Sequence, residues 1–207
     1  METIRLRSYS VPSLKACSRH TSSCLRDEVY TCYNEGVHPL VMGGQVGTES
    51  SGKLVAVRTL VLQEGQILLV GHRSTKTGEV WWMAPGGLVH GGEPALDAAA
   101  REVREETGLE VEIDRLIYWL EWIWERSHCV ELYFVGNVIG GELAIGNDPE
   151  LPENRQIIFD ARFFDLKELG QYPVYPKAFR TLLAEHLGQG FPEGATYLGI
   201  SQPDLPR

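Results

Sequence analysis

Three glutamates lie close together near the middle of the chain. Glu102, Glu105 and Glu106 stand at positions i, i+3 and i+4, which on a helix places them in one sector of about 100°. Like charges in that arrangement repel each other, and a hard divalent cation such as Mg²⁺ removes the repulsion because it binds oxygen ligands. Taken alone, the segment fits a solvated helix with an ordinary Arg101–Glu105 ion pair better.

The residues before these glutamates favour a metal site over a solvated helix. Between Gly87 and Leu109 the chain has a glycine, five residues, Glu93, seven residues, and then Arg-Glu-Val-Arg-Glu-Glu-Thr-Gly-Leu. This spacing resembles a complete Nudix box, in which every fixed position is matched. The strand that ends in Ala-Pro-Gly-Gly before it also fits that family. The resemblance covers about residues 53–187.

The resemblance implies an α/β fold, a Nudix-type α/β/α sandwich around a mixed sheet. It also implies cleavage of a pyrophosphate that links a nucleoside to a second group, with Mg²⁺ as cofactor and Mn²⁺ as a substitute. The metal ligands that it implies are the carboxylates of Glu102, Glu105 and Glu106 and the carbonyl of Gly86. Four further residues are structural in the box: Gly87 and Gly108, and the ion pair of Glu93 with Arg101.

Hydrolysis of a pyrophosphate needs a cation to neutralise the charge that builds on its oxygens, and a base for the attacking water. Inside the box the base is Glu105 or Glu102. A base outside the box would come from the acidic loop of residues 147–154, where we favour Glu153. A merely solvated acidic loop explains those residues equally well.

Three tryptophans follow the box, namely Trp119, Trp122 and Trp124. Because side chains alternate along a strand, Trp122 and Trp124 share one face and Trp119 lies on the other. One face packs in the core, and the other is a candidate platform for the substrate base. The sequence does not decide which face is which.

The elements that must position these groups are read from hydrophobic periodicity and from turn residues. Pro94 and Gly108 bound a helix whose expected core face is formed by Leu96, Ala99, Ala100, Val103 and Thr107. The other expected elements are a hairpin of residues 54–62 and 67–70, strands at 111–125, 129–138 and 156–164, and a second helix at 176–187.

Composition and charge limit the ligands, the domain organisation and the location that can be expected. The 207 residues carry a formal net charge of −9, which disfavours binding to nucleic acid or to an anionic membrane. Residues 1–51 are expected to be a disordered extension or a misassigned start, with a transit peptide as the second explanation. Residues 52–188 form the expected domain, and residues 189–207 an irregular tail. Four cysteines without an apolar signal segment point to a cytoplasmic protein.

The leading hypothesis is a Mg²⁺-dependent hydrolase that cleaves the pyrophosphate bond of a nucleoside diphosphate linked to another moiety, such as a nucleoside triphosphate or a nucleotide sugar. The alternative is a Nudix-fold sensor that binds a nucleotide without cutting it, and the intact glutamates speak against that. An isoprenoid diphosphate isomerase has less support, because no dedicated cysteine follows the box. The expected partner is a small nucleotide, without nucleic acid or membrane, and a homodimer stays open.

Overall fold

The computed structural model describes residues 53–201, except for residues 76, 125, 126 and 150 and the side chains of residues 124, 127, 153 and 201. Expectations about residues 1–51 lie outside this range. Seven strands, two helices and two short 3₁₀ helices are described: β1 Lys53–Gln63, β2 Gln66–Arg73, β3 Val80–Met83, α2 Ala95–Thr107, β4 Leu109–Trp124, β5 Ser127–Gly141, η1 Glu153–Arg155, β6 Ile158–Asp165, η2 Leu169–Gln171, α3 Phe179–Gln189 and β7 Thr196–Ser201.

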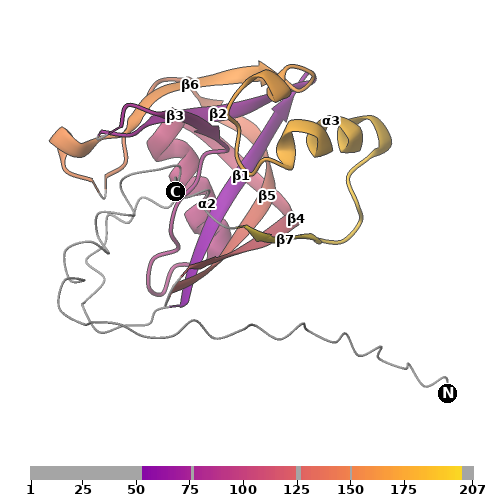
Figure 1. The fold of residues 1–207 in the computed structure, drawn as a ribbon, viewed down its shortest axis with the longest axis horizontal. Coiled ribbons are helices and arrows are strands. Elements are labelled where there is room, and N and C mark those ends of the chain that lie inside the picture. The colour runs from indigo at the N-terminus through magenta and orange to yellow at the C-terminus, as the bar shows by residue number, and fades with distance from the viewer. Residues whose placement is uncertain (1–52, 76, 125–126, 150, 202–207) are drawn as a thin grey trace, which may run out of the picture.

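The strands form one mixed sheet in the order β3-β2-β1-β5-β4-β7, and β6 pairs with β2 (Figure 1). β1 runs parallel to β5, and β4 parallel to β7, whereas the other pairs are antiparallel. The predicted first hairpin is confirmed as β1 and β2, which turn at Glu64 and Gly65 with φ angles of +50° and +80°.

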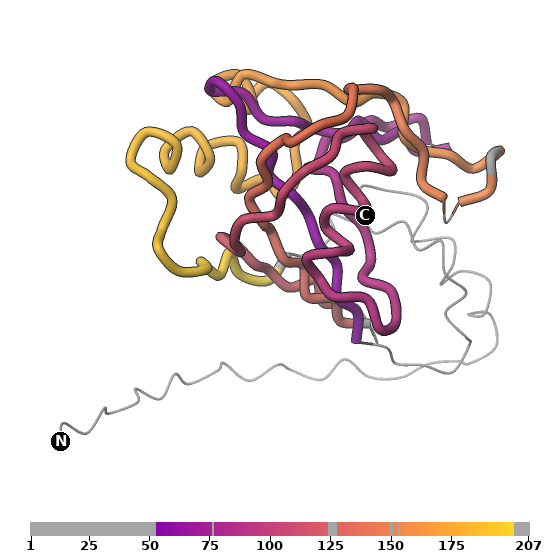
Figure 2. The backbone as a smooth tube through the Cα atoms, turned by 180° about the vertical axis from the view of Figure 1, so that it is seen from behind, coloured from indigo at the N-terminus to yellow at the C-terminus, as the bar shows by residue number. Residues whose placement is uncertain are grey.

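The two helices cover opposite faces of the sheet, as side-chain alternation along β1 shows. Ala56 and Leu60 lie in the core cluster that contains Phe179 of α3. Val57 and Val61 point the other way, into the clusters formed with α2. Figure 1 shows α2 behind β1 and β5, and Figure 2, from the opposite side, shows it in front of them. The sandwich implied by the box is therefore present.

Helix α2 begins and ends where the sequence predicts. Pro94 precedes its first residue, and Gly108 ends it with a left-handed φ of +72°, its N–H bonded to the Arg104 carbonyl at 2.9 Å. The predicted core face is wrong at one residue, Leu96, which is 48% exposed. A helical wheel gives the direction of a side chain, but not whether another element covers that turn.

The strands after the box and the second helix also match the prediction, as β4, β5, β6 and α3. The C-terminal tail does not. Its expected irregular structure contains β7, which pairs in parallel with β4 and places Tyr197 beside Trp119. The irregular structure was predicted from the glycines and prolines of this segment. That prediction overlooked its β-prone run of threonine, tyrosine, leucine and isoleucine.

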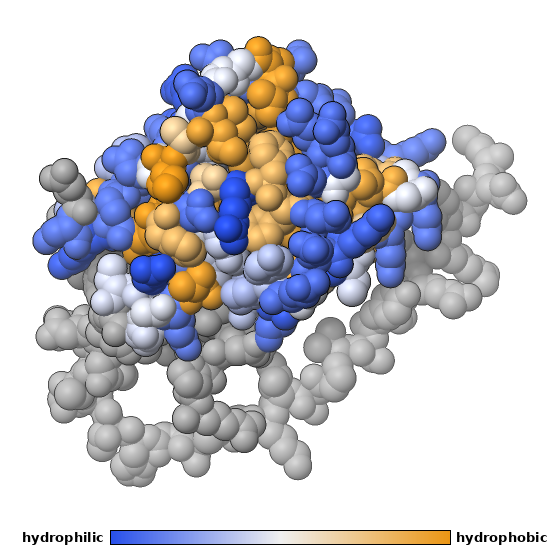
Figure 3. All heavy atoms as spheres, turned by 90° about the horizontal axis from the view of Figure 1, so that it is seen from above, coloured by the Kyte–Doolittle hydropathy of each residue, from blue (hydrophilic) through white to orange (hydrophobic). Residues whose placement is uncertain are grey.

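Apolar side chains gather in the centre of the face seen from above in Figure 3, with hydrophilic side chains around them. Cationic side chains cover some aromatic rings: Arg162 lies 4.8 Å from the ring centroids of both Trp82 and Phe164. Within the described residues, no helix has the length and apolar character needed to cross a membrane.

Candidate active site

The segment after β3 lies against β1 and forms the floor of the candidate site. Two backbone N–H groups of β1, those of Val57 and Thr59, donate to the carbonyls of Gly87 and Pro85 at 2.9 Å each. This close approach requires glycine at Gly86, because a Cβ there would lie 2.0 Å from the carbonyl oxygen of Val57. The glycines of this segment therefore let it run directly along the strand.

Helix α2 places its glutamates on this glycine segment. The Gly86 N–H donates to the Glu106 carboxylate at 2.9 Å. A Cβ on Gly87 would lie 2.6 Å from a carboxylate oxygen of Glu102. A side chain at Gly87 would therefore displace the Glu102 carboxylate from its present position.

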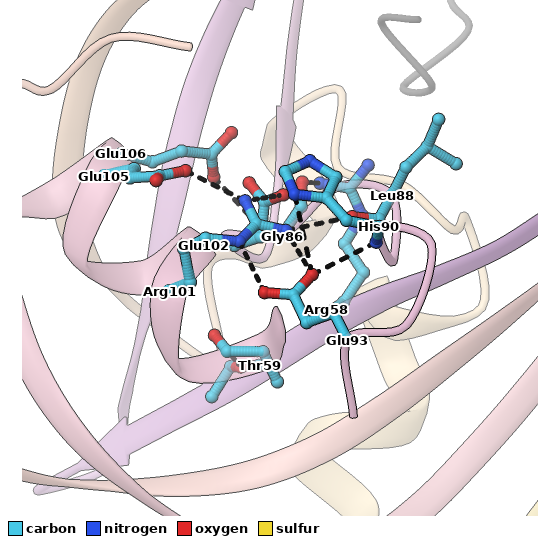
Figure 4. A network of polar contacts seen from close by, with 11 residues as sticks. Arg58, Thr59, Gly86, Leu88, His90, Glu93, Arg101, Glu102, Glu105 and Glu106 are labelled. Atoms are coloured by element: carbon cyan, nitrogen blue, oxygen red, sulfur yellow. Dashed lines mark hydrogen bonds and ion pairs between the residues drawn. The ribbon is translucent and has the colours of Figure 1, made fainter. Parts of the chain in front are cut away.

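Arg101 joins the loop before α2 to the glutamates (Figure 4). Its Nε and Nη2 donate to the two carboxylate oxygens of Glu93 at 2.8 and 3.0 Å, and Nη2 also donates to the Leu88 carbonyl at 3.0 Å. Its Nη1 donates to Glu102 at 2.8 Å and to Glu105 at 3.0 Å. The ion pair implied by the resemblance is thus present, and it extends to two of the three glutamates.

The acidic residues of the site differ in their pKa values. The bonds from Arg101 lower the pKa of Glu93 to about 2. Burial raises the pKa of Glu102 to about 7, against the opposing charge of Arg101. Burial also raises the pKa of Glu106 to about 8. Glu102 and Glu106 are only 7% and 5% exposed, because the glycine segment covers that side of α2.

The donor set fits a hard divalent cation. Three carboxylates and a backbone carbonyl offer only oxygen ligands. Within the described residues no three acidic, histidine or cysteine side chains already converge as for a bound ion. Arg101 Nη1, which is bonded to both Glu102 and Glu105, supplies positive charge between them.

The segment that follows β5 closes the end of α2. The N–H groups of Ala144, Gly146 and Asn147 donate to the last carbonyls of the helix at 2.9 to 3.2 Å. A Cβ on Gly146 would lie 1.9 Å from the Glu105 carbonyl oxygen, so this contact also requires glycine. Sequence analysis assigned no role to Gly146, and its place in a turn-rich loop was the only available signal.

This segment brings one acidic residue to the site. The charge of Asp148 contributes to raising the pKa of Glu106. Glu153, which we favoured as an outside base, lies on η1, and its side chain is outside the described part of the structure. The charge of Asp148 therefore acts on one glutamate of α2, Glu106, and Glu153 as an outside base stays a prediction.

Two buried charged residues near the site were also missed. Arg58 on β1 and Glu131 on β5 are fully buried and form an ion pair at 2.8 Å. Arg58 Nη1 donates to the Gly86 carbonyl at 2.6 Å, so the backbone oxygen implied as a metal ligand already accepts one hydrogen bond. The two residues lie far apart in the sequence, and each resembles an ordinary polar residue in a strand.

The three tryptophans after the box have different environments. Trp122 is 1% exposed, and its Nε1 donates to Glu131 at 2.8 Å. Of the two faces that the sequence left open, the one with Trp122 is the core face, beneath α3, so Trp122 is excluded as a candidate for contact with substrate. Trp119 pairs with Leu132, which packs in an α2-side cluster, and stacks on Tyr197 at 4.2 Å between ring centroids. The Trp124 side chain is outside the described residues.

Two curated relatives with related sequences are a pyrophosphatase and a hydrolase by name. An ADP-ribose pyrophosphatase of Methanocaldococcus jannaschii is 34% identical over 117 residues, which are 56% of this chain and 63% of the relative. A NAD-capped RNA hydrolase NudC of Pseudomonas putida is 30% identical over 148 residues, 72% of this chain and 47% of the relative. The match thus spans less than two thirds of the length of either relative.

Solved structures show the same fold. A NUDIX hydrolase from Nitrosomonas europaea superposes with a TM-score of 0.55 at 22% identity, covering 69% of this chain and 94% of the other. The E. coli ORF135 protein gives a TM-score of 0.51 at 20% identity, covering 67% and 91%. A family model described as the NUDIX domain matches residues 52–184, which is more than half of the chain. The chain therefore belongs to the Nudix hydrolase family.

Proposed function

We propose that this protein is a Mg²⁺-dependent hydrolase that cleaves the pyrophosphate bond of a nucleoside diphosphate linked to a second moiety, with Mn²⁺ as a substitute metal. The observation that carries the proposal is that Glu102 and Glu106 lie against the glycine segment, while Arg101 binds both Glu102 and the third carboxylate, that of Glu105. Glu102, Glu105, Glu106 and the Gly86 carbonyl are the proposed metal ligands.

The residues of the chain would divide the work as follows. A bound Mg²⁺ supplies neutralisation of the charge that builds on the pyrophosphate oxygens and a lower pKa for water. Glu93 holds Arg101 in place, and Arg101 orients the Glu102 and Glu105 carboxylates. The Gly86 N–H fixes the third carboxylate, that of Glu106. Residues held before the substrate arrives need little reorganisation during the reaction.

Glu105 is our first choice for the base that accepts the proton of the attacking water. Its side chain is 24% exposed, against 10% for Glu102, so solvent reaches it more readily. Glu102 is the second choice inside the box. Glu153 remains a prediction for a base outside it, and Asp148 has better support because its charge acts on Glu106.

The substrate class that we favour is an ADP group joined through its diphosphate to a second ribose. The names of the two relatives refer to ADP-ribose and to NAD-capped RNA, and ADP-ribose and NAD share that chemistry. The net charge of −9 favours the small nucleotide over a capped RNA. Trp119 is the proposed stacking residue for the base, because it pairs with Leu132 on the α2 side of the sheet and already stacks on another aromatic ring, that of Tyr197.

A turnover screen tests the function. Purified protein with Mg²⁺ would be offered ADP-ribose, NAD, UDP-glucose, ATP and a NAD-capped RNA oligonucleotide, and products would be identified by mass. We expect ADP-ribose to give AMP and ribose 5-phosphate. Tight nucleotide binding with no turnover of any compound would instead support the sensor alternative. The cytoplasmic location and the oligomeric state stay predictions.

A further inference from the structure

The buried ion pair of Arg58 and Glu131 lies directly beneath the glycine segment of the site. Arg58 is on β1 and Glu131 on β5, two parallel neighbours in the centre of the sheet. Both side chains are 0% exposed. Removing two charges from water is costly, and apolar residues of the same volume often serve stability as well. Core stability alone therefore does not explain an ion pair at this place.

Glu131 is anchored so that its carboxylate cannot turn. One oxygen accepts the Arg58 Nε bond at 2.8 Å. The other accepts two bonds, from Trp122 Nε1 at 2.8 Å and from the Tyr133 hydroxyl at 2.7 Å. Three donors from three neighbouring strands thus fix this carboxylate, and its bond to Nε fixes the plane of the Arg58 guanidinium.

The fixed guanidinium is directed at the end of β3 and the start of the box. Arg58 Nη1 donates to the carbonyls of Ala84 at 3.1 Å and Gly86 at 2.6 Å. The N–H of the same glycine donates to Glu106 at 2.9 Å. Both polar groups of Gly86 are therefore held, one by the core arginine and one by a glutamate of the site (Figure 4).

We propose that Arg58, anchored by Glu131, is a positioning residue that sets the metal affinity of the site by fixing the Gly86 carbonyl. The proposal rests on the metal-dependent function proposed above. Outer residues that orient metal ligands typically change metal affinity by about 10- to 100-fold when they are replaced. We expect a loss of that size here, because removing Arg58 removes the 2.6 Å hydrogen bond that orients the Gly86 oxygen.

Binding of Mn²⁺ to the metal-free full chain, measured by electron paramagnetic resonance, tests this without any turnover. The variant is Arg58→Met with Glu131→Gln, which removes both buried charges and keeps an acceptor for Trp122 and Tyr133. We expect its dissociation constant for Mn²⁺ to rise at least tenfold. A second variant, Arg58→Lys, keeps the charge but lacks the forked geometry, and we expect it to be weakened as well.

Two comparisons make the outcome decisive. Leu183→Ala removes a buried side chain of α3 and lowers stability away from the site, so it should bind Mn²⁺ as the parent does. If the double variant also binds like the parent, or if Arg58→Lys does, the positioning role is refuted. If Glu105→Gln binds Mn²⁺ as tightly as the parent, the proposed metal site itself is wrong, which is a different failure.

Discussion

Replacing Glu106 by glutamine should stabilise the metal-free protein, and should do so increasingly as the pH rises. The Glu106 side chain is 5% exposed, and burial is the main reason that its pKa is raised from 4.5 to about 8. In the unfolded chain the same carboxyl ionises near its ordinary value. Between these two pKa values the folded protein binds the extra proton, so the free energy of unfolding falls as pH rises.

The size of the effect follows from the pKa difference. One pKa unit corresponds to about 1.4 kcal/mol, so a shift from 4.5 to about 8 corresponds to on the order of 5 kcal/mol lost between pH 4.5 and pH 8. Glutamine has the same shape and does not titrate. Its carboxamide oxygen can accept the Gly86 N–H bond that Glu106 accepts at 2.9 Å, so the variant should lack this pH-dependent loss.

Denaturant unfolding of both proteins in EDTA at pH 5, 6, 7 and 8 measures this. The stability of the variant relative to the parent should rise by about 3 kcal/mol across that range, and added Mg²⁺ should stabilise the parent more than the variant. Glu185→Gln, on the exposed side of α3, is the control and should show a constant difference. A constant difference for Glu106→Gln would refute the reasoning about burial.

Three further predictions concern the core, a glycine contact and the tryptophans. Glu131→Ala leaves its arginine partner buried without a counter-charge and should lower the free energy of unfolding by about 3–5 kcal/mol; a loss below about 1 kcal/mol in denaturant unfolding would contradict this. Gly146→Ala places a methyl group 1.9 Å from a carbonyl of α2 and should lower the melting temperature, whereas Gly188→Ala, with open space around it, should not. Trp119→Ala should raise KM with little change in melting temperature. Trp122→Phe should lower the melting temperature with little change in KM, because it loses the buried hydrogen bond to Glu131. Similar KM values for both variants would exclude Trp119 from substrate binding.

The helix of the site could be predicted because its signals are local. Pro94 and Gly108 bound it, and the i, i+3, i+4 spacing places the three glutamates together. The spacing does not show what covers the helix. Burial of Glu102 and Glu106 depends on the glycine segment, which is brought to α2 by its pairing with β1. Their raised pKa values therefore could not be foreseen from the sequence.

The contacts that the sequence could not reveal join distant residues. Arg58 and Glu131 are 73 positions apart, and a charged residue in a strand normally indicates a solvent-facing position. The sequence also does not show that Trp122 is buried, because alternation along a strand defines two faces but does not say which one packs in the core. Pairing between β4 and β5 and packing against α3 decide that question in the folded protein.

The most direct test of the central claim is hydrolysis of ADP-ribose in ¹⁸O-labelled water, followed by mass spectrometry of the products. In the proposed reaction the water oxygen bonds to one phosphorus and the bridging oxygen leaves with the other phosphate, so a single product should carry one ¹⁸O. Turnover should stop in excess EDTA and fall by about 10³-fold, or ~4 kcal/mol, in Glu105→Gln, while Glu185→Gln stays at the parent rate. Full turnover by Glu105→Gln, or by the parent in EDTA, would contradict catalysis by metal-binding carboxylates of α2.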